Sequence, residues 1–301
     1  MAKPHLTYLK KNYQGYLLML PFLLVFFTFT VWPVVMSMGL SFTTYNVFEA
    51  PRFLGFENYV KLFFNDSVFL TAMQNTFLLS IIVGPLSYLL SLFLAWMVNE
   101  FRNPWRTILT VVFYAPTLSN AVFTIWLIVF DGDIYGYLNS ILLKMGLISD
   151  PIQWTRDPKY MMMVVIIVQL WVSLGTSFLT LRAGFNTVDR QYYEAGSLEG
   201  IKNRFQELWY ITLPQMRPQL LIGAVLSISG SFAIGVQPAA LTGMPSTDYS
   251  THTLVLHIQD YGNTRLEMGY ASAVAVVLFV IMVVSWVVIN KAISSVAPDE
   301  G

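Results

Sequence analysis

The side chains that could do chemistry in this 301-residue chain are hydroxyls, amides and aromatic rings rather than nucleophiles or metal ligands. There is no cysteine, which excludes disulfides, thiolate metal sites and cysteine nucleophiles. The three histidines, His5, His252 and His257, are too scattered for a metal cage. No paired carboxylates or Ser–His arrangement falls within an apolar stretch, so we expect no catalytic residue, no metal site and no enzymatic activity.

The candidate binding groups are polar side chains inside long apolar stretches, where an amide or hydroxyl is costly unless it is partnered. They are Tyr114, Asn120, Gln169, Trp171, Ser173, Ser227, Ser229, Ser231 and Gln237. Such groups suit a neutral, hydroxyl-rich solute better than an ion. Serines in membrane helices also bond to their own backbone or to a neighbouring helix, so each serine has a structural explanation as well.

The elements that must position these groups are membrane helices. The chain is 55% hydrophobic and 11% charged, with a mean hydropathy of +0.59, whereas soluble domains carry about 25% charged residues. Six stretches lack Asp, Glu, Lys and Arg altogether, and each reaches the length of about 20 residues that a transmembrane helix needs. They are 12–48, 67–99, 107–130, 160–181, 218–247 and 268–290.

Prolines and glycines interrupt several of these stretches, which indicates kinked or broken helices. They are Pro21 and Pro33 in the first, Gly84 and Pro85 in the second, Pro116 in the third, and Gly235 and Pro238 in the fifth. Such breaks fit a solute path, although kinks made for packing alone are at least as common. The absence of charge within the stretches disfavours a proton-coupled carrier.

The basic residues predict the orientation. With the N-terminus inside, 11 of the 17 lysines and arginines fall in cytoplasmic segments and the remaining six fall outside. We therefore expect a cytoplasmic N-terminal segment (1–12), a six-helix transmembrane domain (13–291) and a cytoplasmic tail (292–301). The net charge is zero, so nothing indicates a nucleic-acid partner.

One charged cytoplasmic loop, residues 183–217, stands out. Asp189 is placed to cap a short helix through Glu199, and Gly200 to end it. Phe205, Leu208 and Trp209 then form the apolar stripe of a second helix. We expect Pro214 to stop that second helix and Pro218 to begin the fifth span.

The same loop resembles the EAA loop of the ABC-importer permeases. The matching residues are Glu194-Ala195-Gly196, then Gly200, then Ile211-Thr212-Leu213-Pro214. Gly196 replaces the second alanine of that pattern, and ten residues rather than nine separate Gly200 from Ile211.

The resemblance covers nearly the whole chain and extends to the carbohydrate-uptake, maltose-type branch of the binding-protein-dependent permeases. The further matches are Arg52–Tyr59, Asn75-Thr76, Tyr135-Gly136 with Leu138-Asn139, Trp154, Asp157-Pro158, and Leu241–Pro245, a degraded form of L-T-x-G-G-P.

This resemblance implies the all-α architecture of a type I ABC-importer permease and an ATP-driven import of sugars or oligosaccharides across a bacterial inner or plasma membrane. It implies four kinds of partner: a second homologous permease, two copies of a cytoplasmic ATPase, an extracytoplasmic sugar-binding protein and the lipid bilayer. ATP and Mg would be bound by the ATPase, since this chain has no G-x-x-x-x-G-K-[ST] motif and is expected to hold no cofactor.

The resemblance also assigns residues. Glu194, Ala195 and Gly196 would contact the ATPase, Gly200 would make the turn, and Ile211, Leu213 and Pro214 would complete the coupling loop. By position, the sugar contacts would be Gln169, Val172, Ser173, Ser227 and Ser231, to which Tyr114 and Asn120 are added from the polar groups of the third span. The alternatives are an ABC permease for glycerol phosphate or a polyamine, or, from a different class, a sodium-coupled carrier acting alone.

Overall fold

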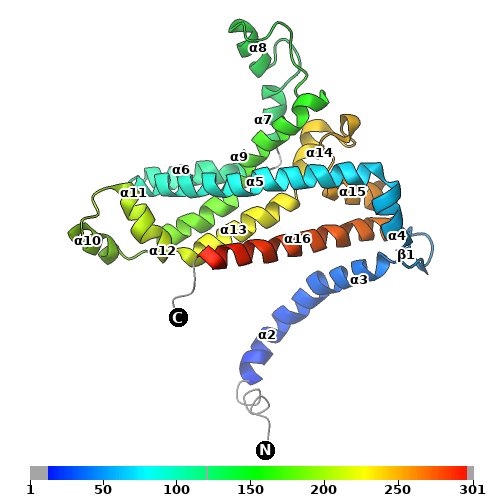
Figure 1. Cartoon of the computed structure of the whole chain (residues 1–301), viewed down its shortest axis with the longest axis horizontal. Helices are drawn as coiled ribbons and strands as arrows, with labels where there is room; N and C mark the ends of the chain where they lie inside the picture. Colours follow the sequence, from blue (N-terminus) through cyan, green and yellow to red (C-terminus); the bar gives the residue numbers. More distant parts are fainter. Residues whose placement is uncertain (1–12, 120, 297–301) are drawn as a thin grey trace, which may run out of the picture. The chain divides into compact units, whose positions relative to one another are not determined.

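The computed structural model describes residues 13–119 and 121–296, which form two compact units (Figure 1). The first unit combines the chain up to residue 65 with residues 258–277, and the second combines residues 66–257 with the chain from residue 278. The predicted N-terminal segment 1–12, residue Asn120 and the end of the predicted tail, 297–301, lie outside the described residues.

The first unit is a helix followed by a small polar cap. Its elements are α2 (Tyr13–Phe26), η1 (Phe27–Val31), α3 (Trp32–Leu40), β1 (Thr43–Thr44), β2 (Arg52–Phe53), α4 (Glu57–Val60), η2 (Lys61–Asn65) and η6 (Asp260–Thr264). The strands β1 and β2 pair antiparallel, with Thr43 opposite Phe53. Pro21 lies inside α2 and Pro33 begins α3, and between them the chain makes the π-helical turn η1, which agrees with the expected interruption of this span.

The second unit is a packed helical bundle. Its elements are α5 (Ser67–Glu100), α6 (Trp105–Tyr114), η3 (Ala115–Leu118), α7 (Val122–Val129), α8 (Tyr137–Lys144), α9 (Pro158–Phe185), α10 (Arg190–Leu198), α11 (Arg204–Glu207), η4 (Leu208–Thr212), α12 (Leu213–Gln215), α13 (Arg217–Phe232), α14 (Val236–Thr242) and η5 (Thr247–Tyr249). Two helices, α15 (Leu254–Gln259) and α16 (Met268–Val296), run from one unit into the other.

The long helix α5 lies along both α9 and α13, and these three helices form the centre of the bundle (Figure 1). Asp66 caps α5 by accepting a hydrogen bond from the Phe69 amide, and Asp157 caps α9 in the same way ahead of Pro158. Two apolar clusters fill the bundle: one includes Leu79, Val83 and Phe123, and the other Phe178, Leu181 and Met216.

Four helices are long and apolar enough to cross a membrane: Leu17–Leu40, Ser67–Glu100, Pro158–Phe185 and Met268–Lys291. Two bent pairs of helices meet the same test when each pair is taken together. The pair 105–118 and 122–129 is bent by 88°, and the pair 217–232 and 236–242 by 46°. The chain is therefore a multi-pass helical protein with four to six apolar helical spans among its described residues.

The expected breaks are found in two different forms. Gly235 separates α13 from α14, as the sequence predicts. Pro116 lies in the 3-10 turn η3, and the third stretch bends just after it. Pro85, by contrast, lies inside α5, which continues without a break to Glu100. The neighbouring helices support α5 along its length, so one missing backbone donor does not interrupt it.

Candidate functional site

Most of the predicted binding residues of α9 and α13 line one cavity. It encloses about 380 Å³ in the second unit, where the bend at Gly235 turns α14 across the end of α13. The five residues that the resemblance implies as sugar contacts all line it: Gln169, Val172, Ser173, Ser227 and Ser231. Of the other polar candidates, Gln237 also lines the cavity, whereas Trp171 and Ser229 do not. No lysine, arginine, aspartate or glutamate is among its described lining residues, so the cavity offers only neutral hydrogen-bonding groups.

Gln169 is the most informative of these groups. Its side chain is 6% exposed, and within the described residues its amide oxygen Oε1 has no hydrogen-bond partner. A buried amide oxygen left in this state costs about 1–3 kcal/mol. That cost would be recovered if a ligand hydroxyl donated to it, which makes Gln169 the strongest candidate ligand contact.

The serines of the cavity are already bonded within the protein. Ser177 Oγ and Ser227 Oγ lie 2.6 Å apart, joining α9 to α13, and Ser231 Oγ donates to the Ile228 carbonyl at 2.6 Å. Ser173 Oγ donates to the Leu170 carbonyl at 3.0 Å. Each hydroxyl oxygen can still accept a further hydrogen bond, so a serine that is bonded within the protein can also contact a ligand.

The third span contributes differently from the prediction. Tyr114, at the end of α6, is not among the residues that line the cavity, so its assignment to the path has no support in the geometry. The turn η3 instead places Pro116 and Thr117 at the wall, because Gly175 of α9 lacks the Cβ that would collide with Thr117. The predicted contact Asn120 lies outside the described residues.

The loop 183–217 has the predicted helix, turn and helix. Asp189 caps α10 through a hydrogen bond from the Gln191 amide, and Gly200 turns the chain at φ +98°, a conformation that side chains disfavour. The second helix runs from Arg204 through α11, η4 and α12 to Gln215. Leu208 packs on the apolar core, whereas Phe205 is exposed, so the predicted apolar stripe is only partly buried within the chain.

The expectation that Pro214 stops this helix is wrong. The π-helical turn η4 closes with a hydrogen bond from the Leu213 amide to the Leu208 carbonyl, five residues back. This wider turn shifts the backbone hydrogen-bond register immediately before Pro214, whose backbone nitrogen carries no hydrogen to donate. The helix therefore continues through Pro214 to Gln215. Pro218 lies in the first turn of α13, as predicted.

The two helices of the loop are held together by small and polar contacts. Gly196 is buried, and a Cβ there would lie 2.7 Å from Ile211 Cδ1. Tyr193 Oη and Thr212 Oγ1 lie 2.9 Å apart. The replacement of alanine by Gly196 therefore has a local cause: Ile211 occupies the space of the missing methyl group.

The opposite face of α10 is open. Glu194 and Ala195 are exposed, and Leu198 is 90% exposed although it is a leucine. Glu194 contacts only its helical neighbour Arg190 by ion pairing among the described residues, at 3.1 Å. A surface of this kind, apolar at one end and acidic at the other, is available to a partner.

Arg204 links the loop to the end of α5. It pairs with Glu100 at 3.3 Å and with Glu207 at 2.7 Å. The hydrogen bond that Arg204 donates to Glu207 and the charge of Glu100 raise the pKa of Arg204 above its ordinary value, so it is always cationic. Exposed ion pairs of this kind add about 0–1 kcal/mol, so Arg204 orients the loop rather than anchoring it.

A family model supplies the decisive comparison. Residues 87–294, which contain the cavity helices α9 and α13 and the whole loop, match the model of the binding-protein-dependent transport system inner membrane component. This chain belongs to that family. The predicted membership of the ABC-importer permeases is confirmed, and so is the prediction of a multi-pass protein of the inner membrane.

Relatives of this permease match over most of their length. It is 31% identical over 278 residues to "Probable ABC transporter permease protein YesP" of Bacillus subtilis (strain 168), covering 91% of this chain and 88% of the relative. It is 29% identical to the arabinooligosaccharides transport system permease protein AraP of the same organism, covering 91% and 86%. It is 28% identical to the lactose transport system permease protein LacF of Rhizobium radiobacter, covering 94% of each.

A solved structure confirms the fold. A chain of a bacterial ABC transporter involved in the import of the acidic polysaccharide alginate matches with a TM-score of 0.78, covering 98% of this permease and all of that chain. A chain of a bacterial alginate ABC transporter solved in complex with an alginate pentasaccharide-bound periplasmic protein also matches, with a TM-score of 0.78. At 21% identity this likeness shows the fold of an ABC-importer permease.

Two other motif residues of the permease, the buried Asn139 and the half-buried Asn75, anchor irregular segments. Asn139 accepts hydrogen bonds from Trp154 Nε1 at 2.8 Å and the Ile152 amide at 3.1 Å, and donates to three backbone carbonyls. Asn75 donates to the carbonyls of Tyr249 and His252. Their role is to fix loops at one end of the spans.

Sequence reasoning missed several residues of the site. Thr117 and Ser177 line the cavity, and Leu198 lies on the open face of α10. Ser177 could have been found, because it follows Ser173 by one helical turn. Leu198 had no signal of its own, since a lone leucine in a short helix predicts burial.

Proposed function

We propose that this chain is the permease subunit of an ATP-driven ABC importer for sugars or oligosaccharides. The observation that carries the proposal is the uncharged cavity around Gln169, lined by hydroxyls and by an amide oxygen that lacks a partner among the described residues. The names of the relatives support it, since two of them refer to arabinooligosaccharides and to lactose. In this proposal a second permease subunit forms the other half of the path.

We propose six spans, with both bent helix pairs counted as crossings and both termini in the cytoplasm. The distribution of lysines and arginines supports this orientation. With six crossings the loop 183–217 follows the fourth span and lies in the cytoplasm. The segments 41–66 and 248–267 then lie on the extracytoplasmic side, where a sugar-binding protein would deliver its cargo.

The loop 183–217 would couple transport to a pair of ATPase subunits, which alone would bind ATP and Mg. We assign the exposed face of α10, formed by Glu194, Ala195 and Leu198, to the ATPase contact. Gly196 and Ile211 would hold that face in place from the inside, and Gly200 would set the turn. Leu213 and Pro214, in the last helical segment before α13, would anchor the loop against the fifth span.

The test is reconstitution. The complex of both permeases and the ATPase, with the binding protein, should import a neutral sugar into liposomes only with ATP, and the chain alone should move none. Glu194→Ala should leave membrane insertion intact and lower uptake more than ATP hydrolysis. Uptake by the purified chain without ATP would refute the proposal and favour a carrier acting alone.

One observation favours a second candidate. The chain is 25% identical over 278 residues to the sn-glycerol-3-phosphate transport system permease protein UgpA of Pectobacterium atrosepticum. A phosphate ester would need a cation or several backbone amides in the path, and the described lining of the cavity has no charged group. Uptake of glycerol phosphate that is not inhibited by any neutral sugar would establish this alternative.

A further inference from the structure

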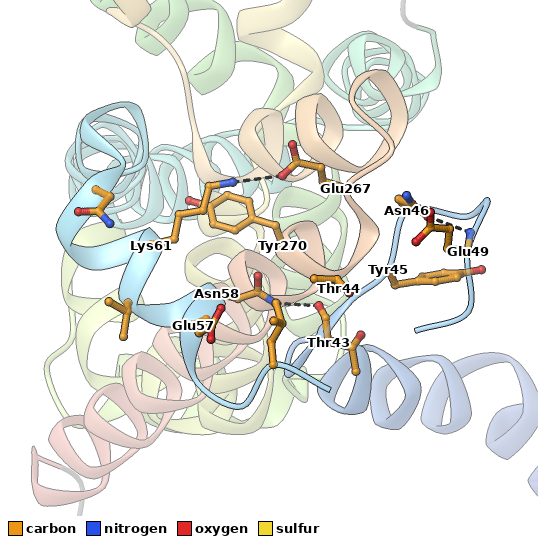
Figure 2. A pocket seen from close by; sticks show the side chains of 13 residues that line it. Thr43, Thr44, Tyr45, Asn46, Glu49, Glu57, Asn58, Lys61, Glu267 and Tyr270 are labelled. Carbon is orange, nitrogen blue, oxygen red and sulfur yellow. Dashed lines mark hydrogen bonds and ion pairs between the residues drawn. The ribbon is translucent and has the colours of Figure 1, made fainter. Parts of the chain in front are cut away.

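The first unit contains a polar pocket that shares no lining residue with the cavity around Gln169. It encloses about 620 Å³ between the segment 43–65 and the residues Glu267 and Tyr270 (Figure 2). Its volume is within the range of about 300–1,000 Å³ that ligand sites occupy. In the proposed topology both segments are extracytoplasmic, so the pocket would face the side from which the solute arrives.

The walls of this pocket are fixed before any ligand arrives. Asn58 is buried, and its Nδ2 donates to the Ser41 carbonyl at 2.8 Å and to the Thr43 carbonyl at 2.9 Å. The Gly269 amide donates to the Tyr45 carbonyl at 3.0 Å. Gly269 must lack a Cβ because one would collide with the Thr43 carbonyl. A preformed wall binds without first having to be ordered.

The described lining residues carry three carboxylates, Glu49, Glu57 and Glu267, and one cation, Lys61, which is already engaged. Lys61 Nζ lies 3.2 Å from Glu267 Oε2 and 4.4 Å from the centre of the Tyr270 ring (Figure 2). Glu49 lies 3.8 Å from Arg52, whereas Glu57 has no ion pair among the described residues. The carboxylates thus outnumber the available cations, which disfavours an anionic ligand.

Other side chains that line the pocket are of the kinds that bind sugars. The Glu57 carboxylate can accept hydrogen bonds from two neighbouring hydroxyls, and the Asn65 amide can both donate and accept. Asn46 Oδ1 already accepts a hydrogen bond from the Glu49 amide at 2.9 Å, so Asn46 offers its Nδ2 as a donor. Tyr45 is half-buried and lines the same space, so its ring can cover the apolar face of a pyranose. Hydrogen-bonding groups beside an aromatic ring match a ligand that has hydroxyl edges and a C–H face.

We infer that this pocket is a second saccharide site, which holds one or two units of a neutral oligosaccharide outside the apolar helices. The inference rests on the proposed function and extends it: the permease would contact its solute before the solute reaches the cavity around Gln169. The occupant is a neutral sugar rather than a sugar acid, because the lining carboxylates would repel a carboxylate.

The experiment measures saccharide binding to the permease pair with its ATPase in nanodiscs, without the binding protein. Saturation-transfer NMR with maltotriose, lactose and arabinotriose reports contact with the protein. We expect Tyr45→Ala and Glu57→Gln each to weaken binding of the best of these sugars at least tenfold. Phe48→Ala is the matched control, since Phe48 is an exposed aromatic residue of the same segment that does not line the pocket.

Further arms separate this site from the cavity and from a protein-docking surface. Gln169→Ala should leave the Tyr45-dependent signal in place, and trigalacturonate should bind at least tenfold more weakly than a neutral trisaccharide. Wild-type binding in both Tyr45→Ala and Glu57→Gln would overturn the inference, as would weaker capture of the binding protein with unchanged sugar binding. If the complete importer carries no neutral sugar, it is the proposed function that fails.

Discussion

Leu198 provides the sharpest test of the proposed ATPase-contact surface on α10. It is 90% exposed at the end of α10, so substitution should leave the fold of the chain intact. If the ATPase covers Leu198, Leu198→Ala removes three buried carbons from that contact. At about 0.8 kcal/mol for each, the loss is about 2.4 kcal/mol. Since about 1.4 kcal/mol corresponds to a factor of ten, the dissociation constant should rise about 50-fold.

The measurement is the affinity of the purified ATPase for the permease pair in nanodiscs, followed by ATP-driven uptake in liposomes. The matched control is Leu147→Ala, because Leu147 is a leucine with 66% exposure in the connection between α8 and α9, on the proposed extracytoplasmic side. The control should bind ATPase normally. An affinity for Leu198→Ala within twofold of the wild type would refute the assignment of this face.

Three further predictions concern residues with different roles. Gln169→Leu removes the acceptor for a ligand hydroxyl, and the lost hydrogen bond is worth about 1.4 kcal/mol. The half-saturating sugar concentration of uptake should therefore rise about tenfold, while the affinity for the ATPase stays unchanged. Gly200→Ala forces a residue with a side chain into φ +98°, which should lower the free energy of unfolding by about 1–3 kcal/mol and so lower the thermal unfolding temperature. The control Gly146→Ala, at the less strained φ +68°, should lower it less. Asn139→Leu should cost about 2–4 kcal/mol because it leaves the Trp154 N–H and the Ile152 amide without their acceptor, and unchanged thermal stability would contradict that role.

Much of the architecture can be predicted from the stretches of the sequence that contain no charged residue. The first, second, fourth and sixth charge-free stretches each coincide with one long apolar helix. The helix, turn and helix of the loop 183–217 could also be predicted, because the cap at Asp189 and the turn at Gly200 are set by neighbours in sequence. Local chemistry of this kind leaves a pattern that can be recognised without any tertiary contact.

The remaining features depend on contacts between distant segments. The fit of Ile211 against Gly196 and the approach of Thr117 to Gly175 are set by how the helices pack, which no periodicity encodes. The π-helical turn η4 changes one hydrogen-bond register, and its residues look like any other helical residues. For the same reason the pocket around Tyr45 escaped prediction: it joins residues more than 200 positions apart.

Two helices connect the cavity around Gln169 directly to the loop 183–217, and this connection offers a mechanical route for the proposed coupling. The helix that carries Gln169 ends at Phe185, five residues before α10 begins at Arg190, and the helix that carries Ser227 begins at Arg217, the last residue of the loop. Phe185 comes sixteen positions after Gln169 in α9, which is about 24 Å of helix at about 1.5 Å per residue. A tilt of about 5° in a rod of that length displaces its far end by about 2 Å. Because a hydrogen bond weakens steeply beyond about 3.2 Å, a displacement of that size is enough to break a contact between Gln169 and a solute. Small movements of α10 would therefore suffice to release a neutral solute, with no charged group needed inside the membrane.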